Sequence, residues 1–310
     1  MKNINKIIIN FPTNIGDAIL ALPALDRIKA NFPWVEITAI VSPKTKEFLS
    51  QNNFIDKIVL FDKCWRIRKK VRFCLNLRKQ FDLMVDFKNS MLPIFLRVKK
   101  HTSFIRSFPK KTHIKDKYLK LVENIAPKPA HLKSKFIVPE SYEKKWGFSD
   151  REKYIFFGCF SRSHRKECPI DNLTTLIDKL KSKYRCVLLG LAQDQKKFNQ
   201  SQLELEVINL VGKTDMIDVY FLLSRFAAAV VAVDSSIMHL SSYLDIPVVG
   251  LFGPTAPQRS YPWSKNSVIL QNKKLDCIPC EGKKKCDDIK CMDMEPKKII
   301  SAIKKILDDE

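Results

Sequence analysis

Long apolar runs are missing from this chain of 310 residues. No stretch reaches the roughly 18 consecutive apolar residues that a membrane-spanning helix needs, so we expect no such span. The beginning of the chain resembles a signal peptide only superficially, because Pro12, Gly16 and Asp17 interrupt the first apolar stretch and a helical pattern follows it. These features predict a folded cytoplasmic protein.

Two signatures of nucleotide and metal binding are also missing. No G-x-G-x-x-G follows the apolar run at residues 7–11, which argues against a dinucleotide-dependent dehydrogenase. No D-x-D element follows a predicted strand, and Asp287 and Asp288 lie in a Cys-rich segment. We therefore expect no Mg²⁺ or Mn²⁺ bridge to a diphosphate, no catalytic metal and no cofactor required for catalysis.

Acidic residues are scarce relative to basic ones, and the net charge is +22. Residues 1–150 carry 30 Lys and Arg against 13 Asp and Glu, a net of +17, whereas residues 151–310 carry 25 against 20, a net of +5. Such a field attracts phosphates, anionic lipid surfaces or nucleic acid, or simply keeps the protein in solution. A nucleic-acid-binding protein is the alternative from another class. No aromatic RNA-binding signature or helix-turn-helix pattern supports it, so no nucleic-acid partner is expected.

The apolar pattern alternates between strands and helices in two successive blocks, which is typical of α/β domains with doubly wound parallel sheets. A stretch rich in Pro and Lys, residues 126–152, separates the blocks. We expect one Rossmann-like domain over residues 1–150 and a second over 151–310. The predicted strands are 7–11, 37–41, 57–60, 83–86, 103–105, 135–138, 154–157, 186–189, 207–210, 228–233, 248–251 and 268–270. The predicted helices are 16–32, 44–52, 65–80, 117–125, 170–183, 216–225, 237–244 and 296–307.

Two segments place reactive side chains directly after a predicted strand, where ligands meet an open parallel sheet. In the first, Asp17 follows a Gly turn and opens a helix, so it is either a helix-capping carboxylate or a general base. In the second, Asp234-Ser235-Ser236 follows the strand 228–233, with His239 one helical turn further on. The segment Phe252-Gly253-Pro254-Thr255 comes later.

Together these motifs resemble those of glycosyltransferase family 9, the bacterial lipopolysaccharide heptosyltransferases, and the resemblance runs across most of the chain. A Cys-bearing segment makes it most similar to the enzymes that add the second heptose of the inner core. The resemblance implies a GT-B architecture, with two Rossmann-like domains facing across a cleft. It also implies an inverting, metal-independent transfer of heptose from ADP-heptose to the lipopolysaccharide inner core. Another nucleotide sugar or another glycoconjugate acceptor is the alternative.

The resemblance assigns the acceptor to the first domain, with Asp17 as catalytic base, and the nucleotide-sugar donor to the second. Backbone amides and hydroxyls at the start of the helix after Asp234 suit phosphate oxygens, although plain helix capping has the same pattern. Lys166 would stabilise charge on the departing diphosphate. Ser236 stands where the family has Gly, and Cys168 where it has Trp. The implied donor-binding residues are Ser161, Lys166, Asp218, Asp234, Ser235, Ser236 and His239.

The implied acceptor is a lipid-anchored anionic glycan, and two basic stretches of the first domain could bind it. Residues 63–79 form a basic amphipathic helix with interleaved aromatic and aliphatic residues, which could lie on the anionic inner-membrane surface or be an ordinary solvated helix. We therefore expect a cytoplasmic protein peripherally associated with the inner membrane. The predicted acceptor-binding residues are Arg68, Lys69, Lys70, Lys99, Lys100 and Arg106.

Four of the nine cysteines cluster near the C-terminus. Cys277, Cys280, Cys286 and Cys291 have the spacing C-x2-C-x5-C-x4-C. Four thiolates this close could hold a structural zinc, remain free thiols or form a disulfide. The sequence leaves these alternatives open.

Overall fold

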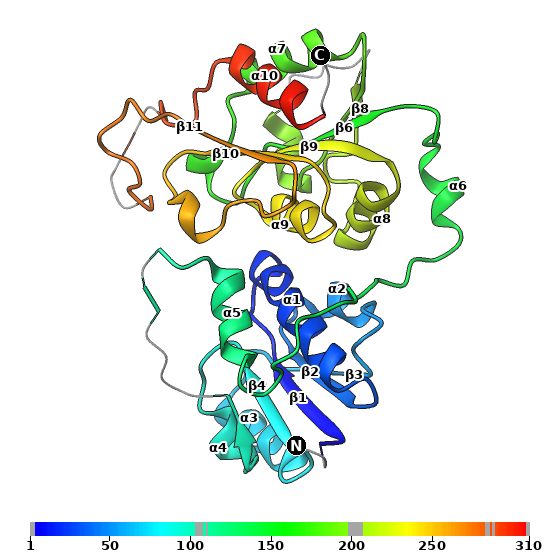
Figure 1. The fold of residues 1–310 in the computed structure, drawn as a ribbon, viewed down its shortest axis with the longest axis vertical. Helices are drawn as coiled ribbons and strands as arrows, with labels where there is room; N and C mark the ends of the chain where they lie inside the picture. Colours follow the sequence, from blue (N-terminus) through cyan, green and yellow to red (C-terminus); the bar gives the residue numbers. More distant parts are fainter. Residues whose placement is uncertain are drawn as a thin grey trace. The chain divides into compact units, whose positions relative to one another are not determined.

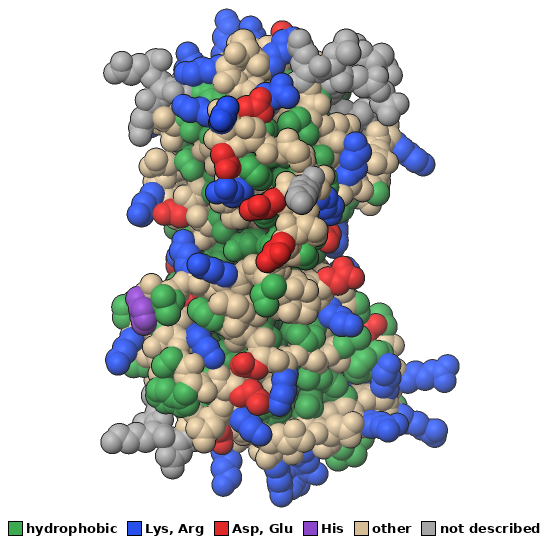
Figure 2. All heavy atoms as spheres, turned by 90° about the vertical axis from the view of Figure 1, so that its right-hand side faces the viewer, with side chains coloured by type: hydrophobic (Ala, Val, Ile, Leu, Met, Phe, Trp, Pro, Cys, Tyr) green, Lys and Arg blue, Asp and Glu red, His purple; other side chains and the backbone are tan. Residues whose placement is uncertain are grey.

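The computed structural model describes residues 4–102, 108–109, 111–197, 207–282, 286 and 289–307 (Figure 1). The chain divides into two compact units, Met1–Ile137 and Val138–Glu310. Each unit contains one parallel β-sheet with helices, so the predicted α/β class is confirmed. Lys and Arg side chains project from the face of the molecule in Figure 2, as the high positive charge leads one to expect.

The first unit has a five-stranded sheet in the order β3-β2-β1-β4-β5. All its pairings are parallel, and the central β1 buries Ile7, Ile8 and Ile9 completely because helices cover both faces of the sheet. Its elements are β1 (Lys6–Asn10), α1 (Ile15–Asn31), β2 (Glu36–Val41), α2 (Lys46–Ser50), β3 (Lys57–Leu60), α3 (Ile67–Leu77), β4 (Leu83–Asp86), α4 (Leu92–Leu96), β5 (Lys100–His101) and α5 (Ile114–Val122).

The second unit has a six-stranded parallel sheet in the order β11-β10-β9-β6-β7-β8. In Figure 1, α7 and α10 lie on one face of this sheet and α8 and α9 on the other. Its elements are α6 (Tyr142–Trp146), β6 (Tyr154–Gly158), η1 (His164–Lys166), α7 (Ile170–Leu180), β7 (Arg185–Leu188), η2 (Ala192–Lys197), β8 (Val207–Asn209), α8 (Met216–Phe226), β9 (Ala227–Val233), α9 (Ser236–Tyr243), β10 (Val248–Phe252), η4 (Pro257–Arg259), β11 (Ser267–Gln271) and α10 (Pro296–Ile306).

In both sheets the order in which successive strands are added reverses at one point. In each unit the first strand lies beside the fourth, which places β1 next to β4 and β6 next to β9. The strands are parallel, so the loops that follow each pair leave from the same edge of the sheet. In open α/β sheets this edge, at the point of reversal, is where ligands bind. Each unit therefore has one such position.

Several predicted elements differ from the structure. The strand predicted at 135–138 is a single antiparallel bridge between Phe136 and Asn52, because only one residue pair meets there. The strand predicted at 103–105 lies outside the described residues. The short helices α4 and α6 were not predicted, since five residues are too few to show a helical period. No helix in the described ranges is long and apolar enough to cross a membrane.

The division between the units lies after Ile137, whereas the sequence placed it after residue 150. Side-chain contacts account for the difference. Tyr142 packs edge-on against Phe221 of α8, with ring centroids 5.7 Å apart. Lys145 forms an ion pair with Asp218, with Nζ 2.7 Å from Oδ1. The segment with α6 is thus held by α8 and belongs to the second unit.

Candidate functional site

The point of reversal in the second sheet carries a compact group of polar side chains. The loop after β6 contains η1 and with it Lys166, while Asp234 follows β9 directly. Because β6 and β9 are neighbours, these loops meet at one edge. The Lys166 Nζ atom lies 2.7 Å from Asp234 Oδ2. Two residues separated by 68 positions, both predicted for the donor site, are therefore in direct contact.

Asp234 has polar partners on both of its carboxylate oxygens. Ser260 Oγ donates a hydrogen bond to Oδ1 at 2.9 Å, and His239 Nε2 lies 3.8 Å from the same oxygen. Burial by itself would raise the pKa of this carboxyl, but the charges of His239 and Lys166 and the hydrogen bonds from Lys166 and Ser260 lower it overall. Asp234 is therefore held as an anion.

Lys166 remains accessible although it is paired. Its side chain is 27% exposed, against 11% for that of Asp234. An ammonium group has three N–H donors, and Asp234 takes one of them. The group can therefore bind a second anion without leaving Asp234.

The N-terminus of α9 lies next to Asp234 in the chain. Ser235 is the N-cap residue in an extended conformation, with φ −149° and ψ 171°, and its side chain makes no capping hydrogen bond. Its hydroxyl oxygen is buried and has no hydrogen-bond partner among the described residues. Ser236 begins the helix and is absent from the positive-φ residues of the described chain, so a side chain is accommodated at the position where the resemblance implies Gly. Backbone N–H groups at such a position suit a phosphate.

His239 is almost completely buried, with 5% of its surface exposed. Its ring stacks on that of Trp263, with centroids 6.2 Å apart and an interplanar angle of 23°. These contacts are compatible with a structural role as well as with the predicted role in donor binding. The ring is packed into the structure, and it also faces the carboxylate of Asp234.

A buried glutamate organises the loop that carries Lys166. Glu167 Oε1 accepts a hydrogen bond from the backbone N–H of Ser161 at 3.3 Å, and its Oε2 lies 3.1 Å from His164 Nδ1. Ser161 Oγ in turn accepts from the backbone N–H of Ser163. The predicted residues Ser161 and Lys166 therefore belong to one loop, tied together by a residue that was not predicted.

Asp218 is the predicted donor residue that lies apart from this group. It forms a capping box with Asp215 at the start of α8, and its Oδ1 pairs with Lys145. Burial, followed by the negative charges of Asp218 and Asp215, raises the pKa of Tyr142 to about 12. Within the described residues, the contacts of Asp218 thus tie α6 to α8.

Two residues of this group, Ser260 and Trp263, were not predicted; they contact Asp234 and His239 respectively. Both follow the segment Phe252–Thr255, and β10 is the neighbour of β9. Their place after the next strand at the same sheet edge was the only available signal. This signal is weak, because the segment between the end of β10 and these two residues is irregular.

In the first unit, Asp17 is the third residue of α1. Asn14 Nδ2 donates to Asp17 Oδ2 at 3.4 Å, and Asp17 is partly exposed. Gly16 lies inside the helix and does not form the predicted turn. Burial, and then the charge of Asp17, raises the pKa of Tyr118 on α5 above its ordinary value. The Asp17 carboxylate therefore lies near the Tyr118 hydroxyl.

A buried polar network supports this edge of the first sheet and was also missed. Asp86, at the end of β4, accepts hydrogen bonds from Asn10 Nδ2 at 2.7 Å and from Ser90 Oγ at 2.7 Å. The backbone N–H groups of Lys88 and Ser90 also donate to it. Burial lowers the pKa of Lys88, and the charge of Asp86 opposes that effect. The network fixes the loop after β4 beside the end of β1.

The predicted acceptor-binding residues occupy two places in the first unit. Arg68, Lys69 and Lys70 lie on α3, where Lys69 Nζ stands 4.1 Å from the ring centroid of Trp65. Lys99 and Lys100 are exposed at the beginning of β5. The pairing of Lys100 with Leu83 puts them at the amino edge of the sheet, opposite the edge that carries Asp17. Arg106 lies outside the described residues.

None of the four clustered cysteines forms a disulfide. Burial, and then the charges of Cys280, Cys277 and Cys286, raises the pKa of Cys291, so the four lie within electrostatic range of one another. In the part of the chain that can be described, no three or more Cys, His, Asp or Glu side chains are arranged as a ready metal site. Zinc binding therefore stays a prediction.

The segment that contains Cys291 packs closely against Gly253 of the Phe252–Thr255 motif. A Cβ atom at Gly253 would meet the Met292 side chain and would stand 3.1 Å from Cys291 Sγ. Any larger residue at this position would force the Met292 side chain to move, so the packing of this segment favours Gly in the Phe252–Thr255 motif.

Comparisons with known proteins concern the chain and its fold as a whole. The chain is 26% identical, over 97% of its length and 99% of the relative's, to lipooligosaccharide heptosyltransferase 2 of Campylobacter jejuni. The solved structure of Escherichia coli ADP-heptose lps heptosyltransferase II superposes with a TM-score of 0.77 at 20% identity, covering 97% of this chain and 98% of that one.

A family 9 glycosyltransferase from Veillonella parvula superposes with a TM-score of 0.80 at 20% identity, covering 99% and 98% of the two chains. These likenesses confirm the GT-B fold class. The profile of glycosyltransferase family 9 (heptosyltransferase) matches residues 77–290, which is more than half of the chain. The chain therefore belongs to glycosyltransferase family 9, as its motifs predicted, and is a glycosyltransferase.

Proposed function

We propose that this enzyme transfers heptose from ADP-heptose to the inner core of lipopolysaccharide, with inversion at the anomeric carbon. The observation that carries the proposal is the group formed by Lys166, Asp234, Ser260 and His239 beside the N-terminus of α9. It joins an accessible cation, a fixed carboxylate and helix amides at the ligand-binding edge of a Rossmann-like sheet. The names of the similar proteins, among them an ADP-heptose lps heptosyltransferase, supply the sugar and the acceptor.

The donor belongs to the second unit in this proposal. The diphosphate binds the amides of Ser235 and Ser236, and Lys166 donates to its oxygens while it remains paired with Asp234. As the bond to the sugar breaks, negative charge grows on the departing diphosphate, and a fixed cation stabilises that charge. Asp234 accepts hydrogen bonds from sugar hydroxyls. Asp218 is proposed to bind the ribose of the donor. On donor binding its carboxylate would leave Lys145 and accept hydrogen bonds from the ribose hydroxyls instead.

The acceptor belongs to the first unit, with Asp17 as the general base. The carboxylate removes the proton from the acceptor hydroxyl as that oxygen attacks the anomeric carbon. Asp17 suits this role because it is partly exposed at the ligand-binding edge, and because the buried network around Asp86 fixes the neighbouring loop. The basic residues of α3 and of β5 are proposed to attract the anionic acceptor at the cytoplasmic surface of the inner membrane. No nucleic-acid partner is proposed.

Donor binding tests the function directly. A ligand at about 100 times its dissociation constant stabilises the folded state by about 2.7 kcal/mol, which corresponds to a rise in Tm of several degrees. We expect ADP-heptose to produce this rise in a thermal-shift measurement, and UDP-sugars to produce none. A rise with a different nucleotide sugar alone would favour the alternative donor. Steep, salt-dependent binding of nucleic acid with no response to any nucleotide sugar would contradict the proposal.

Asp17→Asn should abolish turnover while donor affinity stays unchanged, because a base acts on the acceptor. The expected loss of rate is about 10²-fold or more. The amide keeps an oxygen that can accept the hydrogen bond from Asn14, so the helix start should stay intact. Glu47→Gln, an exposed carboxylate in the first turn of α2, is the matched control and should retain full activity. Near-normal turnover of folded Asp17→Asn would leave Asp17 with a capping role only.

Lys166→Ala should weaken ADP-heptose binding and slow transfer together, since the removed cation meets the diphosphate in both states. It also leaves the largely buried Asp234 without one of its cations, so we expect the pKa of Asp234 to rise. Calorimetric titration and initial rates measure the two functional effects. The control is Lys181→Ala, which removes a Lys from a surface ion pair of similar length with Asp178. If Lys166→Ala matched the control in both measurements, the phosphate site would have to lie elsewhere.

Transfer should continue in EDTA, because Lys166 and the α9 amides supply the positive charge that a divalent cation supplies in other enzymes. If the Cys cluster holds zinc, the chelator should lower Tm without lowering the rate of the folded enzyme at assay temperature. Metal analysis of the purified protein reports the zinc content independently. Recovery of activity in chelated, folded enzyme only on addition of Mg²⁺ or Mn²⁺ would rule out the metal-free mechanism.

A further inference from the structure

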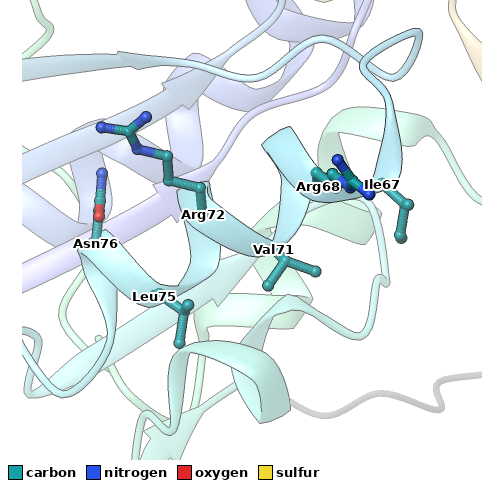
Figure 3. Close-up of a pocket in the computed structure, with 6 residues that line it drawn as sticks. All are labelled: Ile67, Arg68, Val71, Arg72, Leu75 and Asn76. Carbon is teal, nitrogen blue, oxygen red and sulfur yellow. The ribbon is translucent and has the colours of Figure 1, made fainter.

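Helix α3 exposes a stripe of aliphatic side chains. Ile67, Val71 and Leu75 are 72%, 50% and 59% exposed, and their spacing of four residues places them on one face of the helix. They line a shallow groove of about 350 Å³ together with Arg68, Arg72 and Asn76. In Figure 3 the three aliphatic side chains point to the same side of α3, and Arg72 and Asn76 point to another.

This stripe is not the side of α3 that packs against the protein. Phe73 is buried in a core cluster with Leu92 and Leu96 of α4, and Leu77 packs against that cluster. The helix therefore has a second apolar side that is left in solvent. An ordinary surface helix keeps its outer side polar, and a contiguous exposed apolar surface marks a binding site.

The neighbouring helix also exposes apolar side chains. Helix α4 packs against α3, and around it Met91, Ile94 and Phe95 are 56%, 53% and 59% exposed. We call these three residues, together with Ile67, Val71 and Leu75, the α3–α4 surface. The apolar residues of α3 therefore serve two purposes: Phe73 and Leu77 pack against the protein, whereas Ile67, Val71 and Leu75 are exposed.

Charge indicates what the α3–α4 surface binds. Between Ile67 and Leu77 the helix carries four basic residues and no acidic one. Arg68 and Arg72 line the groove itself. A helix with an apolar face and a strongly basic remainder is suited to the boundary between anionic headgroups and acyl chains.

We propose that the α3–α4 surface inserts its apolar side chains into an anionic lipid bilayer, while the basic residues of α3 bind the headgroups. The occupant is the bilayer itself, and the insertion depth is that of an interfacial helix, roughly 5–10 Å. The inference rests on the proposed function in one respect, because a lipid-anchored acceptor gives the enzyme a reason to be there. Beyond that function, insertion of the aliphatic side chains is proposed to hold the protein on the membrane in addition to the attraction between charges.

Insertion and charge respond differently to salt. Salt screens attraction between exposed charges and headgroups, with a Debye length of about 10 Å at 0.1 M and about 3 Å at 1 M. Burial of aliphatic side chains is not weakened in this way. Membrane binding that persists in concentrated salt therefore reports the aliphatic part of the α3–α4 surface.

The test is co-sedimentation of the full-length protein with phosphatidylglycerol vesicles in dilute and in 1 M salt. The variant Ile67→Ser/Val71→Ser/Leu75→Ser should bind about tenfold or more weakly in both conditions, since it removes three apolar contacts of the kind that drive interfacial binding. The matched control, Leu132→Ser/Ile137→Ser/Leu191→Ser, changes three residues that are 56%, 62% and 47% exposed elsewhere, and should bind as the wild type does.

A second variant separates the two contributions. Arg68→Ser/Lys69→Ser/Lys70→Ser/Arg72→Ser should lose binding mainly in dilute salt and should match the wild type in 1 M salt. If the triple aliphatic variant does not fold, Leu75→Ser alone replaces it, with an expected loss of about threefold.

Equal vesicle binding by the aliphatic variant and its control would overturn the proposal. So would a wild-type dimer that the aliphatic variant converts to a monomer with unchanged vesicle binding, because the surface would then join two copies of the chain. Heptose transfer to a delipidated, water-soluble acceptor should be the same for wild type and aliphatic variant. If the wild type transfers no heptose to either form of acceptor, the proposed function fails, and the vesicle result still stands on its own.

Discussion

The adjacency of β6 and β9 is the constraint on which the proposed donor site depends. These strands are far apart in the sequence and lie side by side only because the sheet reverses its order between them. That reversal brings the loop with Lys166 to the residue that follows β9, and the 2.7 Å contact with Asp234 results. Burial makes an isolated carboxylate unfavourable, so the pairing also lets Asp234 remain charged where a ligand can use it.

The two units use the same topology with different chemistry. At the reversal point of the second unit, cations and a helix N-terminus surround an anion, and an accessible ammonium remains. At that of the first unit, Asp86 is buried and satisfied by Asn10, Ser90 and two backbone amides, which leaves Asp17 as the partly exposed carboxylate. A cationic site suits a diphosphate, and a carboxylate on a rigid support suits proton removal. This difference fits the proposed division of donor and acceptor between the units.

The surface of the first unit has a feature that fits its proposed role in acceptor binding. Its basic excess is spread along the chain, but α3 concentrates four basic residues beside an aliphatic stripe. The proposed lipid-anchored acceptor would be reached more readily by an enzyme whose affinity for the membrane interface does not depend on the reacting sugars. Residues on a helix outside the sheet can supply that affinity without altering the loops at the ligand-binding edge.

The alternation of strands and helices, the family and most candidate residues could be predicted from the sequence, because apolar period and short motifs are local properties. Asp17, Lys166, Asp234 and Ser235 are recognisable for this reason. Contacts between distant segments were not predictable: the bonds of Ser260 and Glu167, the pairing of Asp218 with Lys145, and the attachment of α6 to the second unit. The aliphatic stripe of α3 was likewise hidden, since sequence marks a residue as apolar but only packing decides which apolar side of a helix is buried.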